Sequence, residues 1–253
     1  MTTTALDRLL LAIALSSAFA HPLHAQDKQE EPASGHAVTA EDATHLEKLQ
    51  LAIKLIGENR HDEAIHDTLD PLIADFEAKY ADPETRYYCP NTPAETLAYL
   101  VGAAAESDRG ESKFKQTLAV APTWAYAYYY KAYALLDLDR VEQAQPFLEK
   151  ALHLAPMNPM FLSELGHLRR MRTDWEGSLA AYADSLDATA TASTDEARKL
   201  DQARALRGQG YALIELGRLD EAKAKYRKSL KLDPGSSVAK GELEYLDKLK
   251  SKK

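Results

Sequence analysis

A repeating pattern of small, aromatic and proline residues constrains the fold of this chain more than any other feature. Copies of the pattern cover residues 125–158, 159–192 and 203–236. The first two copies start 34 residues apart, and the third starts 44 residues after the second, as expected if a short insertion precedes it. A period near 34 with two helical stretches per unit is typical of a solenoid of helix hairpins.

Small residues occupy equivalent places in the three copies, and larger ones occupy others. Two antiparallel helices approach closely only where the side chains between them are small, because the distance between helix axes depends on the residues at the contact. Proline at the thirty-second place of the first and third copies would end the second helix. The small places are Ala132, Gly166 and Gly210 (eighth) and Ala144, Ser178 and Ala222 (twentieth); the large ones are Tyr128, Leu162 and Leu206 (fourth) and Leu148, Tyr182 and Tyr226 (twenty-fourth).

Two stretches resemble the tetratricopeptide repeat family: GYALIELGRLDEAKAKYRKSLKLDP at 210–234 and AYALLDLDRVEQAQPFLEKALHLAP at 132–156. The resemblance implies an all-α fold, a right-handed α-solenoid of stacked helix hairpins. It further implies a scaffold or adaptor that binds a protein or peptide in a concave groove without a chemical step. No cofactor is expected.

The same pattern extends upstream in weaker form. When the pattern starts at Asn91, the expected small, apolar and proline places hold Leu97, Ala98, Val101, Gly110, Phe114 and Pro122. When it starts at His45, the matching places hold Leu51, Ala52, Leu55 and Ala64. In the second case Pro71 falls inside the second helix, and Thr68 replaces the usual aromatic residue. We therefore expect degenerate repeat-like helical units over 41–124, with an extra loop around 82–91.

The two ends of the chain differ from its body. Arg8, a short apolar run and Ala18-Phe19-Ala20 are typical of a secretory signal peptide over 1–20, cleaved after Ala20 or Ala25. The run is shorter than the roughly 20 residues that a membrane-spanning helix needs. Residues 21–40 read as a disordered linker. The sequence thus predicts a periplasmic or secreted protein.

The C-terminal half carries two further signals. Thr194 is placed to cap a long helix that continues to Leu216 after a flexible connection, ATATAST, at 188–194. Residues 237–253 should form a capping helix with a basic tail. The net charge of −8 argues against nucleic acid as a partner, because nucleic-acid binding depends on neutralising phosphates.

The resemblance also implies which residues face the groove, since the second, fifth, ninth, twelfth and thirteenth places of each repeat do so in this family. A peptide could lay apolar groups on the tyrosines and an acidic group against the arginines. Alternatively, some of the tyrosines at 126–130 pack between adjacent units. The candidate groove residues are Tyr99, Tyr126, Tyr129, Tyr133, His167, Arg170, Arg204, Arg207 and Tyr211.

The single cysteine, Cys89, leaves two readings open: a buried structural thiol or an intermolecular disulfide. The second belongs to an alternative function, a self-assembling structural subunit of an envelope complex, which would be a homo-oligomer. Catalytic and metal signals are weak. Residues 112–115 fit S-x-x-K without its companion motifs, and His61 and His66 are five apart, which does not put them on one helical face.

Overall fold

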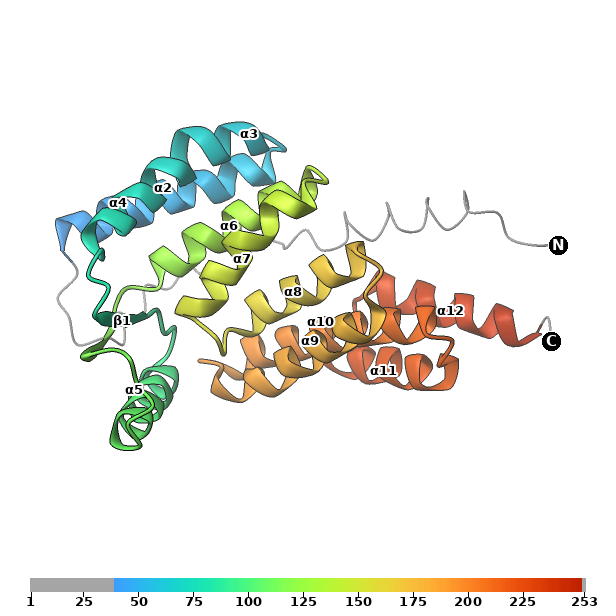
Figure 1. The fold of residues 1–253 in the computed structure, drawn as a ribbon. Helices are drawn as coiled ribbons and strands as arrows, with labels where there is room; N and C mark the ends of the chain where they lie inside the picture. The colour runs from blue at the N-terminus through green and yellow to red at the C-terminus, as the bar shows by residue number, and fades with distance from the viewer. Residues whose placement is uncertain (1–38, 252–253) are drawn as a thin grey trace.

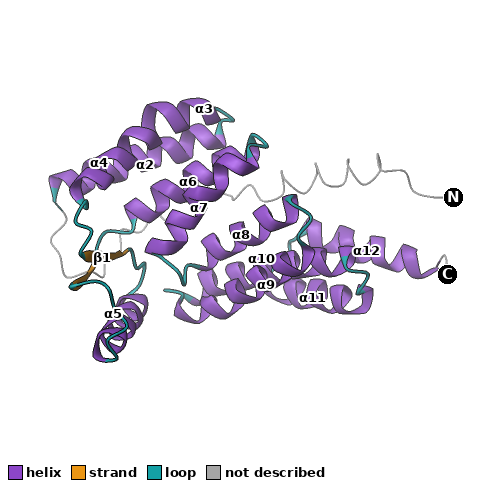
Figure 2. Cartoon of the chain, in the orientation of Figure 1, coloured by secondary structure: helices purple, strands orange, loops and turns teal. Residues whose placement is uncertain are grey.

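The computed structural model describes residues 39–251, and it shows an all-α solenoid of paired helices with a small two-stranded sheet beside it (Figure 1; Figure 2). The predicted signal peptide and the predicted linker up to residue 38 lie outside the described residues. In chain order the elements are α2 (Ala40–Gly57), α3 (His61–Glu63), the π-helix η1 (Ala64–Leu69), α4 (Asp70–Lys79), β1 (Thr85–Tyr88), α5 (Pro93–Asp108), β2 (Gln116–Ala119), α6 (Thr123–Asp137), α7 (Val141–Leu154), α8 (Pro159–Met171), α9 (Trp175–Ala188), the 3-10 helix η2 (Thr189–Thr191), α10 (Asp195–Glu215), α11 (Leu219–Leu232) and α12 (Ser237–Ser251).

The three repeat copies are the hairpins α6–α7, α8–α9 and α10–α11 (Figure 1). Their small places lie where the helices meet: Ala132, Ala144, Ser178 and Ala222 have no measurable solvent exposure. Removing side-chain volume at these places lets the helices approach closely enough for larger side chains to fill the remaining space. The spacing seen in the sequence therefore has the predicted structural cause.

Every hairpin turns at the same place of the repeat. The fifteenth residue has a left-handed backbone in each of the three hairpins, with φ of 58° at Asp139, 59° at Thr173 and 75° at Gly217. Counted from His45, the fifteenth residue is Asn59, and its φ is 59°. The hairpin formed by α2 and the helical segment after it thus shares the turn geometry of the later units.

Pro71 does not end the second arm of this first hairpin. The arm runs through α3, the π-helical stretch η1 and α4, and Pro71 lies in the first turn of α4. Proline removes one backbone donor and clashes with the preceding turn of an α-helix, and a π-bulge widens that turn. The Thr68 hydroxyl lies in the bulge and donates to the Ala64 carbonyl at 2.5 Å.

The unit expected from Asn91 is not a helix hairpin, so this prediction was wrong. Its first half forms α5, but its second half forms strand β2, which pairs in parallel with β1 through Thr85↔Gln116 and the three following pairs. Both strands carry threonine or tyrosine, which favour extended structure. The apolar places of the pattern are consequently left outside the core: Leu97 is 66% exposed and Val101 is 57% exposed.

The connection between the second and third repeats is ordered by contacts, contrary to the expectation of a flexible segment. It contains η2, in which Thr189 is buried and its hydroxyl donates to the Leu186 carbonyl at 2.7 Å. The Thr191 hydroxyl donates to Glu95 Oε1 at 3.3 Å, which ties η2 to the start of α5. The helix cap predicted next to it is confirmed, because Thr194 Oγ1 accepts from the Ala197 amide at 3.1 Å.

Candidate partner-binding site

The first helices of the repeats form one continuous surface, which we call the first-helix face; α6, α8 and α10 contribute to it, and α12 continues it. Aromatic contacts connect α6 to α8. The Tyr129 ring stacks on Phe161 with 4.9 Å between centroids, and Tyr126 meets Phe161 edge-on at 5.2 Å. The groove predicted by the repeat places should therefore be sought on this face.

The centre of the first-helix face is nearly closed. The hollow there holds only about 10 Å³, room for about one water molecule. Tyr129 is 2% exposed, so the structure places it in the core and not on an open groove, whereas Tyr133 is half-buried at the rim. The hollow is lined by Tyr129, Tyr133, Met160, Ser163, Glu164, His167, Tyr182 and Arg204.

Tyr126 and Tyr129 pack between adjacent repeat units, which was the alternative to a position in the groove. Their rings pack against the next unit because Phe161, at the third place of that unit, fills the space between α6 and α8. The repeat pattern assigns places to a face, but it does not reveal how far a neighbouring aromatic side chain covers them.

Tyr99 does not lie on the first-helix face, so its prediction as a groove residue was wrong. It belongs to α5, where it is 5% exposed and stacks on Tyr88 with 4.8 Å between ring centroids. Its hydroxyl oxygen accepts from the Met157 amide at 3.1 Å. The prediction assumed that α5 stacks as a first helix of the solenoid, which it does not do.

The predicted groove arginines already have partners within the chain. Arg204 Nη1 lies 2.7 Å from Asp201 Oδ1, and Arg207 Nη1 lies 2.9 Å from Asp233 Oδ2. The guanidinium of Arg170 lies over the Tyr211 ring, 5.0 Å from its centroid. An acidic group of a partner would therefore have to compete with Asp201 and Asp233 for Arg204 and Arg207. These ion pairs argue against the expected acidic partner group.

A pair of acidic side chains lies where α6 faces α8, and each is matched by a histidine. Asp137 Oδ2 lies 3.2 Å from His61 Nε2, and Glu164 Oε1 lies 3.1 Å from His167 Nδ1. Burial raises the pKa of Asp137, and the hydrogen bond from His61 opposes this change. His167 is itself buried, so it holds Glu164 in place more than it offers a free surface group.

A second acidic pair, Glu215 and Glu242, lies where α10 faces α12. Glu242 is 5% exposed, and burial, with Glu215 as a secondary cause, raises the pKa of Glu242 to about 7. Within residues 39–251 no hydrogen bond or ion pair is found for either carboxylate. The sequence reading missed Glu242, although its signal was available: Glu164 and Glu242 both occupy the sixth place of their helices.

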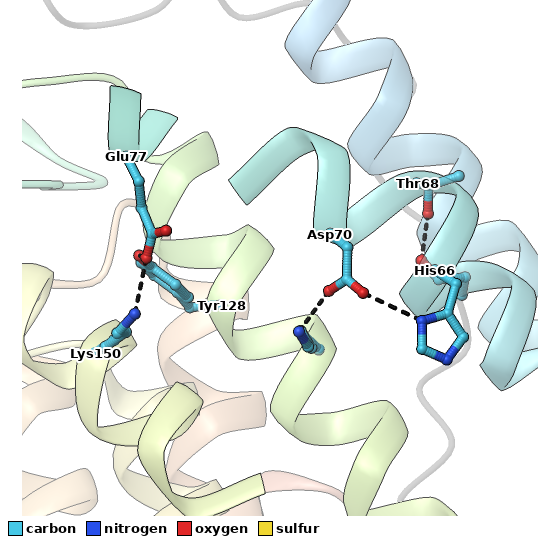
Figure 3. A network of polar contacts seen from close by, with 8 residues as sticks. His66, Thr68, Asp70, Glu77, Tyr128 and Lys150 are labelled. Atoms are coloured by element: carbon cyan, nitrogen blue, oxygen red, sulfur yellow. Dashed lines mark hydrogen bonds and ion pairs between the residues drawn. The ribbon is translucent and has the colours of Figure 1, made fainter. Parts of the chain in front are cut away.

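A larger recess, of about 380 Å³, lies between the first hairpin and α6–α7. Figure 3 shows the polar contacts beside it: Glu77 accepts from Tyr128 at 2.5 Å and from Lys150 at 2.7 Å, and His66 Nδ1 lies 3.2 Å from Asp70. Lys131 also pairs with Asp70. The contacts of Asp70 with Lys131 and of Glu77 with Tyr128 and Lys150 hold the first hairpin to the first repeat.

Cys89 is completely buried, and its amide donates to the Leu154 carbonyl at 2.8 Å. Burial raises the pKa of its thiol to about 12. The structure thus corrects the suggestion of an intermolecular disulfide, because the sulfur is enclosed between the β1 segment and α7. The buried structural reading applies.

The described residues contain no cluster of three or more metal-ligating side chains. His61 and His66 contact different carboxylates, Asp137 and Asp70. No helix in the part of the chain that the structure covers combines the length and the apolar character needed to cross a bilayer.

Comparison with known proteins identifies the repeats. The tetratricopeptide repeat model matches residues 125–158 and 203–236, which are the first and third units. The chain therefore contains tetratricopeptide repeats, and its fold is an all-α solenoid of this type. No curated protein matches the chain.

Several solved structures are similar to it. The first TPR of Spaghetti (RPAP3), bound to the HSP90 peptide SRMEEVD, has 18% identity and a TM-score of 0.44, over 50% of this chain and 93% of that one. The APC/C hetero-tetramer Cut9–Hcn1 has 16% identity and a TM-score of 0.47, and the match covers 81% of this chain and 37% of that one. MamA has 19% identity and a TM-score of 0.38, and the match covers 73% of this chain and 95% of that one.

Proposed function

We propose that this protein is an exported scaffold that binds a protein or peptide partner on its first-helix face, without a chemical step. The observation that carries the proposal is the stack of hairpins with matched turns, two of which match the tetratricopeptide repeat model. Such a stack presents an extended, preformed surface. Because its helices are already ordered, binding costs less conformational entropy than it would for a flexible chain.

The nearly closed hollow indicates how a partner would bind. With room for about one water molecule, it excludes a buried side chain of any size. A partner would therefore lie along the face and contact its half-buried groups, among which are Tyr133, Arg170 and Tyr211. Tyrosine and arginine offer large contact areas with a polar group at the tip, which suits them to this role.

The local structure around the S-x-x-K segment supports a function without catalysis. Ser112 Oγ accepts from the Phe114 amide at 3.2 Å and lies 3.3 Å from the Phe114 carbonyl. The hydroxyl thus belongs to a turn, and Phe114 lies 4.6 Å from the Arg86 guanidinium in a cation–π contact. These contacts account for the segment structurally.

Export is proposed from residues 1–20 and from the thiol chemistry of the chain. In an oxidising compartment an accessible unpaired thiol would form disulfides with other molecules. Cys89 is buried, so the chain is compatible with such a compartment. Cell fractionation of the full chain and of a variant lacking residues 1–20 tests the localisation. Retention of both in the cytoplasm would remove this part of the proposal.

The partner-binding role is tested by photo-crosslinking in living cells from position Tyr133. The matched control is Glu149, which is exposed on the second helix of the same repeat. We expect a discrete crosslinked protein from Tyr133 that is missing from Glu149, and weaker capture from Tyr133 when the substitution Tyr211→Ala is added. Equal products from both positions, or capture unchanged by Tyr211→Ala, would contradict a site on the first-helix face.

The alternative function, a self-assembling structural subunit, would depend on contacts between the ends of the solenoid. Disulfide linkage through Cys89 is disfavoured by its burial, whereas contacts through the ends of the solenoid are untested. Light scattering over a range of protein concentrations distinguishes the two functions, since a monomer at every concentration would exclude self-assembly.

A further inference from the structure

The acidic pair at the end of the first-helix face differs from its counterpart inside the solenoid in one respect. Asp137 and Glu164 each contact a histidine. Glu215 occupies the place equivalent to Asp137, and Glu242 the place equivalent to Glu164, but neither has a cationic or hydrogen-bonding partner within the described residues. A buried carboxylate without a partner is energetically costly, which makes this pair an incomplete arrangement.

The repeat geometry locates Glu242 beside a buried tyrosine. In the preceding unit the Tyr182 ring lies against Gly166 and Gly208, where added Cβ atoms would come within 2.8 Å and 2.3 Å of it. Gly208 is at the sixth place of the third repeat, which begins at Ala203. The ring of Tyr226 lies in the same way against Gly210, at 2.7 Å, and the sixth place of the following helix is Glu242.

Tyr226 adds a second, independent sign that a group is missing here. It is 1% exposed, and its hydroxyl oxygen has no hydrogen-bond partner in the structure. Burial raises the pKa of Tyr226 well above its ordinary value, and the nearby Glu242 carboxylate raises it further. Buried hydroxyls normally have a partner, so an unsatisfied hydroxyl in the same region as an unpaired carboxylate points to a donor that comes from outside the chain.

The neighbouring side chains define the chemistry of that donor. Tyr211 lies on the same stretch of α10, 6.2 Å from the Trp175 ring, and its aromatic surface could cover an aliphatic stem. Arg170 also lies over the Tyr211 ring, and it pairs with neither carboxylate in the described part of the chain. Two carboxylates and a hydroxyl oxygen accept hydrogen bonds, and ammonium and guanidinium groups donate several at once.

We propose that Glu215, Glu242 and Tyr226 form a subsite for a lysine or arginine side chain of the partner. The subsite deepens the proposed partner-binding function and rests on it. The cationic group would enter between α10 and α12, pair with the two carboxylates and satisfy the Tyr226 hydroxyl. The subsite therefore selects a cationic group of the partner, whereas the groove arginines had suggested an acidic one.

The subsite should respond to pH in a defined direction. A bound cation favours the ionised form of Glu242, so binding releases a proton when Glu242 is protonated beforehand. The groups facing Glu242 are Glu215 and Tyr211 from α10 and Tyr226 from α11, with Arg170 beyond them on α8. Affinity for a cationic peptide is therefore expected to increase between about pH 6 and about pH 8.

An array of immobilised decapeptides tests the subsite with the full purified chain. The central residue is lysine, arginine, acetyl-lysine, glutamate or leucine, on one mixed background of apolar and small residues. We expect lysine and arginine peptides to be retained about tenfold better than acetyl-lysine peptides. Glu242→Gln should remove most of this preference, whereas the control Glu244→Gln, exposed on the same helix, should keep it.

Thermal melting of each variant shows that it is folded; both substitutions keep side-chain volume, so loss of folding is not expected. Retention of apolar peptides without a preference for cations, or an unchanged preference in Glu242→Gln, would overturn the subsite and leave the scaffold function standing. No retention of any peptide would count against both.

Discussion

The ring of Tyr226 lies against the backbone of Gly210, so closely that a Cβ there would come to 2.7 Å from the ring. Tyr182 has the same relationship to Gly166, at 2.8 Å. The first repeat carries leucine at the twenty-fourth place and alanine at the eighth. The eighth place is thus glycine wherever a tyrosine ring crosses it, because the ring occupies the volume of a methyl group.

Replacing Gly210 with alanine should therefore destabilise the protein although alanine is the better helix former. Overpacking costs about 1–3 kcal/mol, and the gain in helix propensity offsets at most about 1 kcal/mol of it. Urea unfolding measures the difference. The control is Gly102→Ala in α5, where nothing lies within 4 Å and a gain in stability is expected. Equal effects at the two sites would show that Tyr226 yields to the methyl group.

The turn of the second repeat contains a removable backbone strain. Thr173 has φ of 59°, and a β-branched residue is disfavoured in this region. We expect Thr173→Gly to stabilise the protein by about 1 kcal/mol, measured by the midpoint of urea unfolding. The reciprocal change, Gly217→Thr in the third repeat, should destabilise it by a similar amount. A loss of stability in Thr173→Gly would mean that the threonine side chain contributes contacts that outweigh the strain.

Because α5 is a separate element and not a repeat helix, alanine substitutions at its neighbouring residues Leu97 and Tyr99 should differ in their effect on stability. Leu97→Ala should change the free energy of unfolding by less than about 0.5 kcal/mol, because Leu97 is mostly exposed. Tyr99→Ala should cost about 3 kcal/mol, since it removes a buried ring and leaves the Met157 amide without its acceptor. A large cost at Leu97 would restore the helix-hairpin interpretation of this segment.

Glu242 should make the protein less stable at neutral pH than in mild acid. Its pKa is about 7 in the folded protein and near the ordinary 4.5 when unfolded, so the folded state binds the proton more tightly. The cost is nil below about pH 4.5, grows as the pH rises towards 7, and is complete above that, at up to about 3 kcal/mol.

The variant Glu242→Gln removes this titration. Its gain in stability over the wild type should therefore be largest at about pH 8 and close to zero at about pH 4.5. Chemical unfolding at the two pH values provides the measurement, with Glu244→Gln as the exposed control. A gain of the same size at both pH values would indicate that the carboxylate is not the cause.

The thiol of Cys89 should be unreactive in the folded protein. Complete burial and a pKa of about 12 leave almost no thiolate at pH 8, and the thiolate is the reacting species. Alkylation followed by mass spectrometry should show no modification in buffer and full modification in urea. Rapid alkylation of the native protein would mean that the loop before α5 opens.

Sequence reasoning was reliable where the repeat spacing depends on contacts within one hairpin. The burial of Ala132 and Ala144, the glycine places under the tyrosine rings and the Thr194 cap all depend on residues that are near in the chain. It was unreliable where a segment has a choice of partners. The stretch after Gly110 satisfies its backbone by pairing with Thr85–Tyr88, more than twenty residues away, and no local pattern signals that choice.

The candidate site shows the same division. The repeat spacing predicted the three hairpins, and the resemblance to tetratricopeptide repeats implied which places of their first helices face a groove. The packing of the units determines which of those side chains remain accessible: Phe161 covers Tyr129, Asp233 neutralises Arg207, and the contacts of α12 with α10 and α11 bury Glu242. Exposure and charge pairing depend on residues brought together from separate units, and a repeat pattern holds no information about them.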